Sequence, residues 1–162
     1  MRIGFGGMLA VLVCLAGAPS RAADQPGFTV DGQVRQTLHP NAADVQKLPV
    51  IELEVAFEAQ GKMQKAKFKG ALLLDILNKA EIVDAEGKGS AFRHAIEVAS
   101  SDGYAINLAI GEFHPFLEGK QVLVAYERDG QALESMGGLR VVVPGDKHGA
   151  RSIRDLVRIT VK

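Results

Sequence analysis

The feature that most constrains the fold is a short aliphatic run, 139–143, that is followed at once by Pro144-Gly145. Leucine and valine around one arginine, stopped by a turn dipeptide, predict a buried strand. The chain then crosses a polar loop and enters a short turn that carries Arg151, Ser152 and Arg154. Such a strand requires a sheet and a core that bury it, and the basic turn beyond it indicates an anion-binding segment.

Basic residues are concentrated in this stretch. Between Arg140 and Lys162 there are six basic and two acidic residues, whereas 23–139 holds 11 basic and 17 acidic residues. A local excess of cations in a slightly acidic chain favours a site for phosphate or another anion, and no nucleic-acid partner is expected. The alternative is a solvated basic face that binds nothing.

The first 22 residues have the order of a secretory signal. A basic start precedes an apolar run at 8–16, and small residues precede a cleavage point after Ala22. The run is too short to cross a bilayer as a helix. We therefore expect a signal peptide at 1–22 and an exported protein that is not inserted in a membrane. The only cysteine is Cys14, so no disulfide is expected in the exported part.

Residues 23–162 suffice for one domain with its own core, and many short strands with a few short helices predict an α+β fold on a mixed sheet. Strands are predicted at 27–38 (a pair around Asp31-Gly32), 50–58, 63–69, 93–100, 104–110, 121–133 (a hairpin at Asp129-Gly130) and 139–143. Helices are predicted at 42–47 (capped by Asn41), 71–80 and, as one turn, 111–117.

Four segments resemble the sulfite-oxidase-type molybdopterin-binding domain family. The last stretch, G-G-L-R-V-V-V-P-G followed by H-G-A-R-S-I-R, resembles its C-terminal signature. In the same order upstream, 68–77 resembles its F-x-G-x-x-L-x-D-x-L segment, 101–104 its S-x-D-G-Y and 122–130 its V-L-L-A-Y-x-x-N-G. The resemblance implies a mixed β-sheet, sulfite-oxidase-like molybdopterin-binding fold, as a single pterin-binding-like domain over 23–162.

The chain departs from this family at the position of the metal-binding cysteine. Enzymes of the family bind molybdenum through a cysteine thiolate shortly before the F-x-G segment, and here Ala56 and Phe57 stand near that position. Neither Glu54 nor Glu58 supplies a soft sulfur ligand. The expected cofactor is a pterin, free or molybdopterin-like, with no metal and no redox catalysis.

The resemblance also implies a ligand site near the end of the chain. Ser152, Ile153 and Arg154 match the family's pterin and phosphate contacts, although Arg154 stands where a lysine is usual and Asp155 where a tryptophan is usual. Arg151 lies three residues before Arg154, so one turn could present both cations to an anion. The alternative is a pair of surface arginines.

Three more candidate ligand residues lie nearby. Arg140 sits among valines, where an unpaired cation costs several kcal/mol, so it needs an acidic partner or a ligand, and the resemblance favours the ligand. His148 is a candidate polar contact in the same loop. Ser135 matches a position that is a histidine in the catalytic relatives.

Asp102 and Tyr104 are candidates for the ligand's ring. The carboxylate of Asp102 could accept from the paired N–H donors of an amino-pyrimidine edge, and Tyr104 could lie against the ring. The alternatives are a turn residue before Gly103 and a half-buried strand tyrosine. The four histidines form no closely spaced pair, so no zinc site is expected.

The resemblance implies a periplasmic, non-catalytic pterin-binding protein. Some single-domain periplasmic members of the wider family bind free pterins and report to inner-membrane cyclic-di-GMP signalling proteins, and this chain is similar to them in length, leader and missing thiolate. The expected partner is the periplasmic domain of such a membrane protein. Alternatives are a sulfite-oxidase-like molybdopterin-dependent oxidoreductase with an unusual metal ligand, and an interaction module that has lost its ligand.

Overall fold

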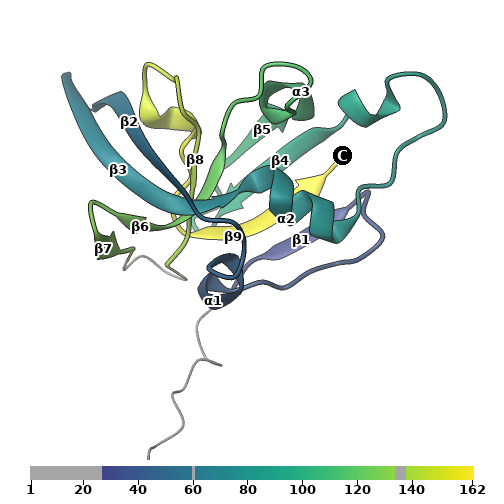
Figure 1. The fold of residues 1–162 in the computed structure, drawn as a ribbon, viewed down its shortest axis with the longest axis horizontal. Coiled ribbons are helices and arrows are strands. Elements are labelled where there is room, and N and C mark those ends of the chain that lie inside the picture. Colours follow the sequence, from purple (N-terminus) through teal and green to yellow (C-terminus); the bar gives the residue numbers. More distant parts are fainter. Residues whose placement is uncertain (1–26, 60, 134–137) are drawn as a thin grey trace, which may run out of the picture.

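In the computed structural model, two β-sheets pack together and short helices lie at their edges (Figure 1). The structure describes residues 27–59, 61–133 and 138–162, so the predicted signal peptide and Ser135 lie outside the described residues. Strands interspersed with short helices confirm the predicted α+β class. Within those ranges, no helix is long and apolar enough to cross a membrane.

The first sheet has four strands in the order β1-β9-β4-β5. They are β1 (Thr29–Gly32), β9 (Leu156–Val161), β4 (Ala95–Ser100) and β5 (Ala105–Ala109). β1 pairs in parallel with β9, and the other neighbours are antiparallel. Arg158 and Thr160 of β9 donate hydrogen bonds to the carboxylate of Asp31 in β1.

The prediction that residues 27–38 form a pair of strands is wrong about the main pairing partner of the first of these strands, β1. Only one bridge joins Val30 to Leu38 there. β1 pairs instead with β9, which the sequence analysis did not predict. The distant partner wins because Val30 is fully buried beside Ile159, and that burial requires an apolar strand from outside the local turn.

The second sheet has five strands and includes a long hairpin that extends to the left in Figure 1. Its strands are β2 (Ile51–Ala59), β3 (Lys62–Leu72), β6 (Leu123–Arg128), β7 (Gln131–Ala132) and β8 (Arg140–Val142). All pairs are antiparallel. The predicted turn at Asp129-Gly130 is confirmed, because both residues have the positive φ that a type I′ turn requires.

Strand β8 contributes to two hydrophobic cores. Because side chains alternate along a strand, Val141 enters the main core between the sheets, and Val142 enters a smaller cluster around Phe68 on the other face of the second sheet. The Val141 N–H donates to the carbonyl of Ile153 at 2.9 Å, and the Leu156 N–H donates to the carbonyl of Leu139 at 3.3 Å. β8 therefore lies between β6 and the segment that leads into β9.

The helices follow local signals. Asn41 forms a capping box with Asp44 at the start of α1 (Ala42–Val45), which confirms that prediction apart from its length. The helix predicted at 71–80 begins two residues later, as α2 (Leu73–Ala80), because β3 continues through Leu72. The remaining elements are α3 (Ile110–Phe113) and the 3₁₀ turns η1 (Ser90–Phe92) and η2 (Gly149–Arg151).

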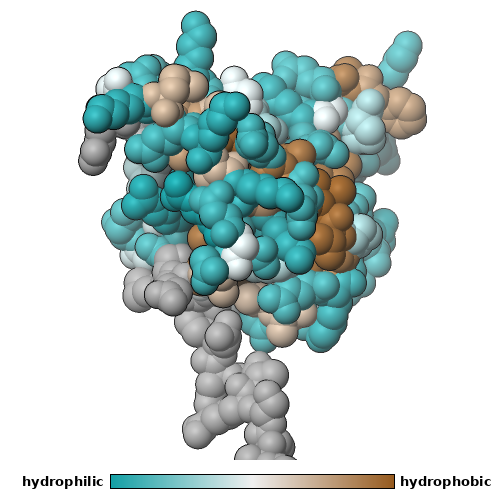
Figure 2. Space-filling model, turned by 60° about the vertical axis from the view of Figure 1, so that its left-hand side comes forward, coloured by the Kyte–Doolittle hydropathy of each residue, from teal (hydrophilic) through white to brown (hydrophobic). Residues whose placement is uncertain are grey.

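Most of the surface displayed in Figure 2 is hydrophilic, and hydrophobic residues gather in a few places. The most exposed large apolar side chain in the described residues is Phe116, at 84%, directly after α3. Its ring stacks on His114 with centroids 5.5 Å apart, and the ring of Phe92 meets the same histidine edge-on.

Candidate functional site

A polar pocket of about 430 Å³ lies where the β4–β5 turn meets the segment after η2. Its lining residues are Ser100, Asp102, Tyr104, Gly149, Ala150, Ser152, Ile153, Arg154 and Asp155. The structure thus brings five of the predicted ligand residues to one pocket although 50 positions separate the two segments. It does not bring Arg140, His148 or Arg151 to the lining of this pocket.

The turn before β5 forms one wall of the pocket. The Tyr104 N–H donates to Oδ1 of Asp102 at 2.9 Å, which is the contact of a turn residue. The Tyr104 hydroxyl donates to the carbonyl of Ala150 in η2 at 3.1 Å, and the side chain is 52% exposed. Tyr104 therefore ties the two walls together, and Asp102 keeps its second oxygen for another donor.

Arg140 is a buried cation at the start of β8, 8% exposed. Its Cζ lies 5.5 Å from the centre of the Phe68 ring, and Cζ of Arg128 lies 5.8 Å from the same ring. Burial, and then the like charges of Arg154 and Arg128, lower the pKa of Arg140 to about 10, so it remains charged at neutral pH. Within the part of the chain that the structure describes, its Nε has no hydrogen-bond partner.

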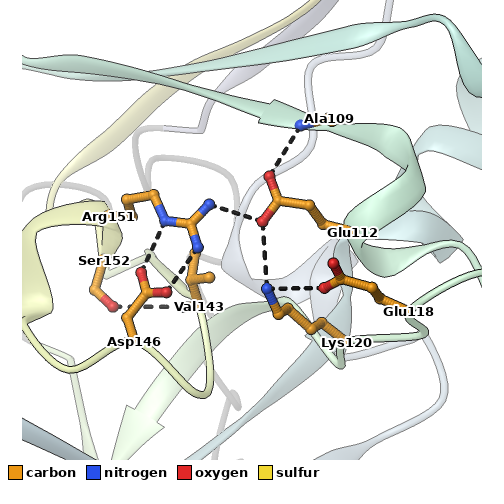
Figure 3. A network of polar contacts seen from close by, with 8 residues as sticks. All are labelled: Ala109, Glu112, Glu118, Lys120, Val143, Asp146, Arg151 and Ser152. Atoms are coloured by element: carbon orange, nitrogen blue, oxygen red, sulfur yellow. Dashed lines mark hydrogen bonds and ion pairs between the residues drawn. The ribbon is translucent and has the colours of Figure 1, made fainter.

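Arg151 has the opposite environment, shown in Figure 3. Its Nε and one terminal nitrogen donate to the two oxygens of Asp146 at 2.8 and 2.6 Å, and the other terminal nitrogen donates to Glu112 of α3 at 2.7 Å. Glu112 also accepts from the Ala109 N–H and lies 3.5 Å from Lys120. These charge-assisted bonds raise the pKa of Arg151.

This arrangement corrects the prediction that Arg151 and Arg154 present their charges to one anion. The guanidinium of Arg151 is already neutralised by two carboxylates, whereas no carboxylate among the described residues pairs with Arg154, which is exposed. The sequence could not give this result because Glu112 is 39 residues away. Arg151 holds η2 against α3 and so positions the segment that follows.

The other predicted residues have mixed placements. The Ser152 hydroxyl accepts from the Val143 N–H at 3.4 Å. Ile153 is 1% exposed in the main core. Nδ1 of His148 lies 3.8 Å from a carboxylate oxygen of Glu58, on the outer side of the loop. Ser135 lies outside the described residues, so its predicted role stays a prediction.

The position where the family's enzymes carry the thiolate lies beside the loop that leads into η2. Glu58 of β2 forms a bridge with His148, and the Glu58 N–H donates to the carbonyl of Lys147 at 2.8 Å. The Phe57 ring lies 3.5 Å from where a side chain at Gly149 would begin. The structure thus brings the expected thiolate position to the candidate site, and Ala56 and Phe57 offer no metal ligand there. Elsewhere in the described ranges, no group of three or more His, Cys, Asp or Glu side chains could hold a metal ion.

Two residues that the prediction did not include stand out in the structure. Asp155 lines the pocket, and its Oδ1 is buried without a hydrogen-bond partner in the part of the chain that the structure describes. Phe68 lies under two guanidinium groups. Phe68 belongs to the F-x-G segment, so the motif drew attention to this part of the chain. The motif did not predict the contact of Phe68 with Arg140.

The sequence matches the family model described as "Oxidoreductase molybdopterin binding domain" over residues 16–162. The chain therefore belongs to the oxidoreductase molybdopterin binding domain family. Its structure is similar to that of the sulfane dehydrogenase SoxCD from Paracoccus pantotrophus, with a TM-score of 0.68 and 15% sequence identity over 83% of this chain and 37% of that chain. At this identity the likeness shows the fold, and confirms the predicted one. No curated protein sequence matches the chain significantly.

We predict that Arg151→Met destabilises the protein by about 2 kcal/mol, because it removes the cation that pairs with the largely buried carboxylate of Asp146 and leaves Glu112 the longer contact with Lys120. Burial raises the pKa of Glu112, whereas the hydrogen bonds from Arg151 and Ala109 lower it. The lowering effects together are larger, so the pKa of Glu112 lies below its ordinary value. A carboxyl with a lowered folded-state pKa stabilises the fold above its unfolded pKa and loses that contribution as the pH falls. Arg151→Met should therefore flatten the loss of stability between about pH 5 and pH 3.

Denaturant unfolding at several pH values measures both effects. The matched control is Lys65→Met, which removes an exposed ion pair with Glu54 and should change stability by about 0–1 kcal/mol. Equal stability of Arg151→Met and the unmodified protein would contradict the structural role of Arg151.

Proposed function

We propose that this protein binds a pterin without catalysing molybdenum redox chemistry. The observation that carries the proposal is the buried guanidinium of Arg140, whose Nε lacks a partner among the described residues. A ligand with carbonyl, ring-nitrogen or phosphate acceptors supplies what this group lacks. A pterin offers such acceptors on a flat ring that also suits the aromatic surroundings of Arg140.

The energetics of Arg140 support a ligand more than a structural role. A buried cation without a carboxylate costs stability, and here two further arginines lie close enough to oppose its charge. The ring of Phe68 offsets only part of this cost, since a cation–π contact contributes about 1–2 kcal/mol. A ligand acceptor at Nε would reduce the free-energy cost of burying the Arg140 cation. The ligand-bound state is favoured by the amount of that reduction.

The remaining ligand residues are proposed from their positions. Arg154, which borders the pocket and lies near enough to Arg140 to affect its pKa, suits a phosphate or other anionic substituent. The second oxygen of Asp102 and the ring of Tyr104 suit the pterin ring. Ser152 and the backbone at Ile153 are proposed as further contacts to the pterin. His148 and Ser135 are proposed as contacts to the ligand at the margin of the site. Arg151 acts by positioning this segment.

The residues do not fit the family's metal centre. Molybdenum in this family requires a thiolate, and the sequence has one cysteine, Cys14, within the predicted signal peptide. The positions beside the candidate site carry Ala56 and Phe57. The proposed role is therefore binding or sensing, and we assign no redox step to this chain.

We further propose a periplasmic location and a membrane-bound signalling partner that responds to pterin occupancy, such as a cyclic-di-GMP protein. The support is the leader-like order of residues 1–22 and the resemblance to exported, cysteine-less relatives. Mass spectrometry of the mature N-terminus tests the export, and an intact leader on cytoplasmic protein would refute it. Co-purification with inner-membrane proteins, compared with and without added pterin, tests the partner.

Protein purified from its native host is expected to release a small molecule with blue pterin fluorescence and to contain molybdenum well below one atom per chain. Fluorescence of the denatured extract and elemental analysis measure these two quantities. Stoichiometric molybdenum with electron transfer to artificial acceptors would instead favour the oxidoreductase. An extract and a pterin titration that both show nothing would refute the proposal.

Arg140→Met should change stability and affinity in opposite directions. Methionine fills the space without a charge, so the ligand-free protein should unfold at a higher temperature, by an amount that reflects about 1–4 kcal/mol. Loss of a buried charge-assisted hydrogen bond should weaken pterin binding about tenfold to a hundredfold. Calorimetric titration and thermal unfolding of the ligand-free protein measure the two effects.

The matched control is Arg35→Met, because Arg35 is exposed and lies 3.9 Å from its nearest carboxylate. It should leave both quantities nearly unchanged. Arg158 is a poorer control, since it pairs with Asp31 across β1 and β9. Unchanged pterin affinity in Arg140→Met would place the ligand elsewhere.

A further inference from the structure

Asp155 is held in an uncommon backbone conformation at the edge of the polar pocket. Its φ is 48°, in the left-handed region that few residues other than glycine adopt. Its carbonyl accepts from the Ser101 N–H at 3.0 Å, and the next residue, Leu156, donates to Leu139 at 3.3 Å. The backbone is thus fixed on both sides, and backbone strain of this kind is concentrated at functional sites.

The side chain of Asp155 has an unused hydrogen-bond acceptor. Its Oδ1 has no exposure to solvent and no hydrogen-bond partner within the described residues. Only one other buried side-chain atom there shares this property, Nε of Arg140. A buried acceptor without a donor costs about 1–3 kcal/mol. Asp102, in contrast, is exposed and already accepts from Tyr104.

The two unsatisfied groups stand on neighbouring backbone segments. Two backbone hydrogen bonds join 139–141 to 153–156, so Arg140 and Asp155 are carried by paired segments at one end of β8. One group is a donor and the other an acceptor. A planar heterocycle with acceptors on one edge and N–H donors on another offers a partner to each, whereas a sulfate ion offers acceptors alone.

We propose that Asp155 is a specificity-determining residue that accepts hydrogen bonds from the N–H donors of the ligand's amino-pyrimidinone edge. This inference rests on the proposed function and names the ring edge that the same site recognises. Ser100, which is 8% exposed, borders the same pocket. Asp155 thereby selects a 2-amino ring over one that carries a carbonyl at the same place, because a carbonyl would face the carboxylate with a second acceptor.

Two probes that differ at this one position test the assignment. Pterin (2-amino-4-oxopteridine) carries the amino donor, and lumazine (2,4-dioxopteridine) carries a carbonyl acceptor there. Calorimetric titration of the purified, ligand-stripped protein should show preference for pterin. Asp155→Asn should weaken pterin binding about tenfold or more and remove most of that preference, since one carboxylate oxygen becomes a donor.

The matched control is Asp129→Asn, which makes the same change at another aspartate with a left-handed φ (51°), in an exposed turn outside the lining of this pocket, and should keep the preference for pterin. Asparagine tolerates the left-handed conformation, and Asp155→Gly removes the side chain at a φ that glycine adopts freely, so the assignment remains testable if one variant does not fold. Circular dichroism confirms that each variant is folded before titration.

The outcomes separate this inference from the function on which it rests. Pterin binding that is equally tight and equally selective in Asp155→Asn overturns the role of Asp155 and leaves pterin binding intact. Absence of pterin binding in the unmodified protein overturns both. A selective loss of pterin affinity in the Asp155 variants alone supports the assignment.

Discussion

The structure depends on the three residues of β8, which hydrogen-bond to β6 on one side and lie along the segment 153–156 on the other. Alternation along this strand places Val141 in the main core and Val142 in the cluster around Phe68. A strand that belongs to two cores cannot shift without disturbing both sheets. The candidate site includes residues 153–155 of the segment that pairs with this strand, which suits a site that must hold a ring in a fixed orientation.

Two arginines that look alike in the sequence have opposite physical roles. Arg151 is surrounded by carboxylates from two other parts of the chain, and its charge is fully used within the protein. Arg140 is more deeply buried, near two other cations, and none of the described residues gives its Nε a hydrogen-bond partner. A count of basic residues in the last stretch therefore overestimates the charge that is available to a ligand. Burial and partners, not the number of arginines, decide which cation can bind.

Local patterns predicted a large part of the fold. The helix cap at Asn41, the amphipathic face of α2 and the Asp129-Gly130 turn each depend on a few neighbouring residues, and all were confirmed. The parallel pairing of β1 with β9 and the bond from Arg151 to Glu112 depend on chain segments far apart, so no local signal gives them. For the site, five of the residues that the motifs single out border one pocket in the structure. The motifs did not distinguish Arg151, which pairs with two carboxylates, from Arg154, which pairs with none among the described residues. They also missed the buried oxygen of Asp155, which has no partner within the same ranges, because hydrogen-bond satisfaction is a property of the folded chain.

The place of β9 in the first sheet has a consequence for biosynthesis. β9 lies between β1 and β4, although both of these strands precede it in the sequence by more than 50 residues. While the chain is being made, β1 cannot find its parallel neighbour until residue 161 has left the ribosome, and the edge of β4 also stays open. The first sheet is therefore completed only after most of the chain has emerged.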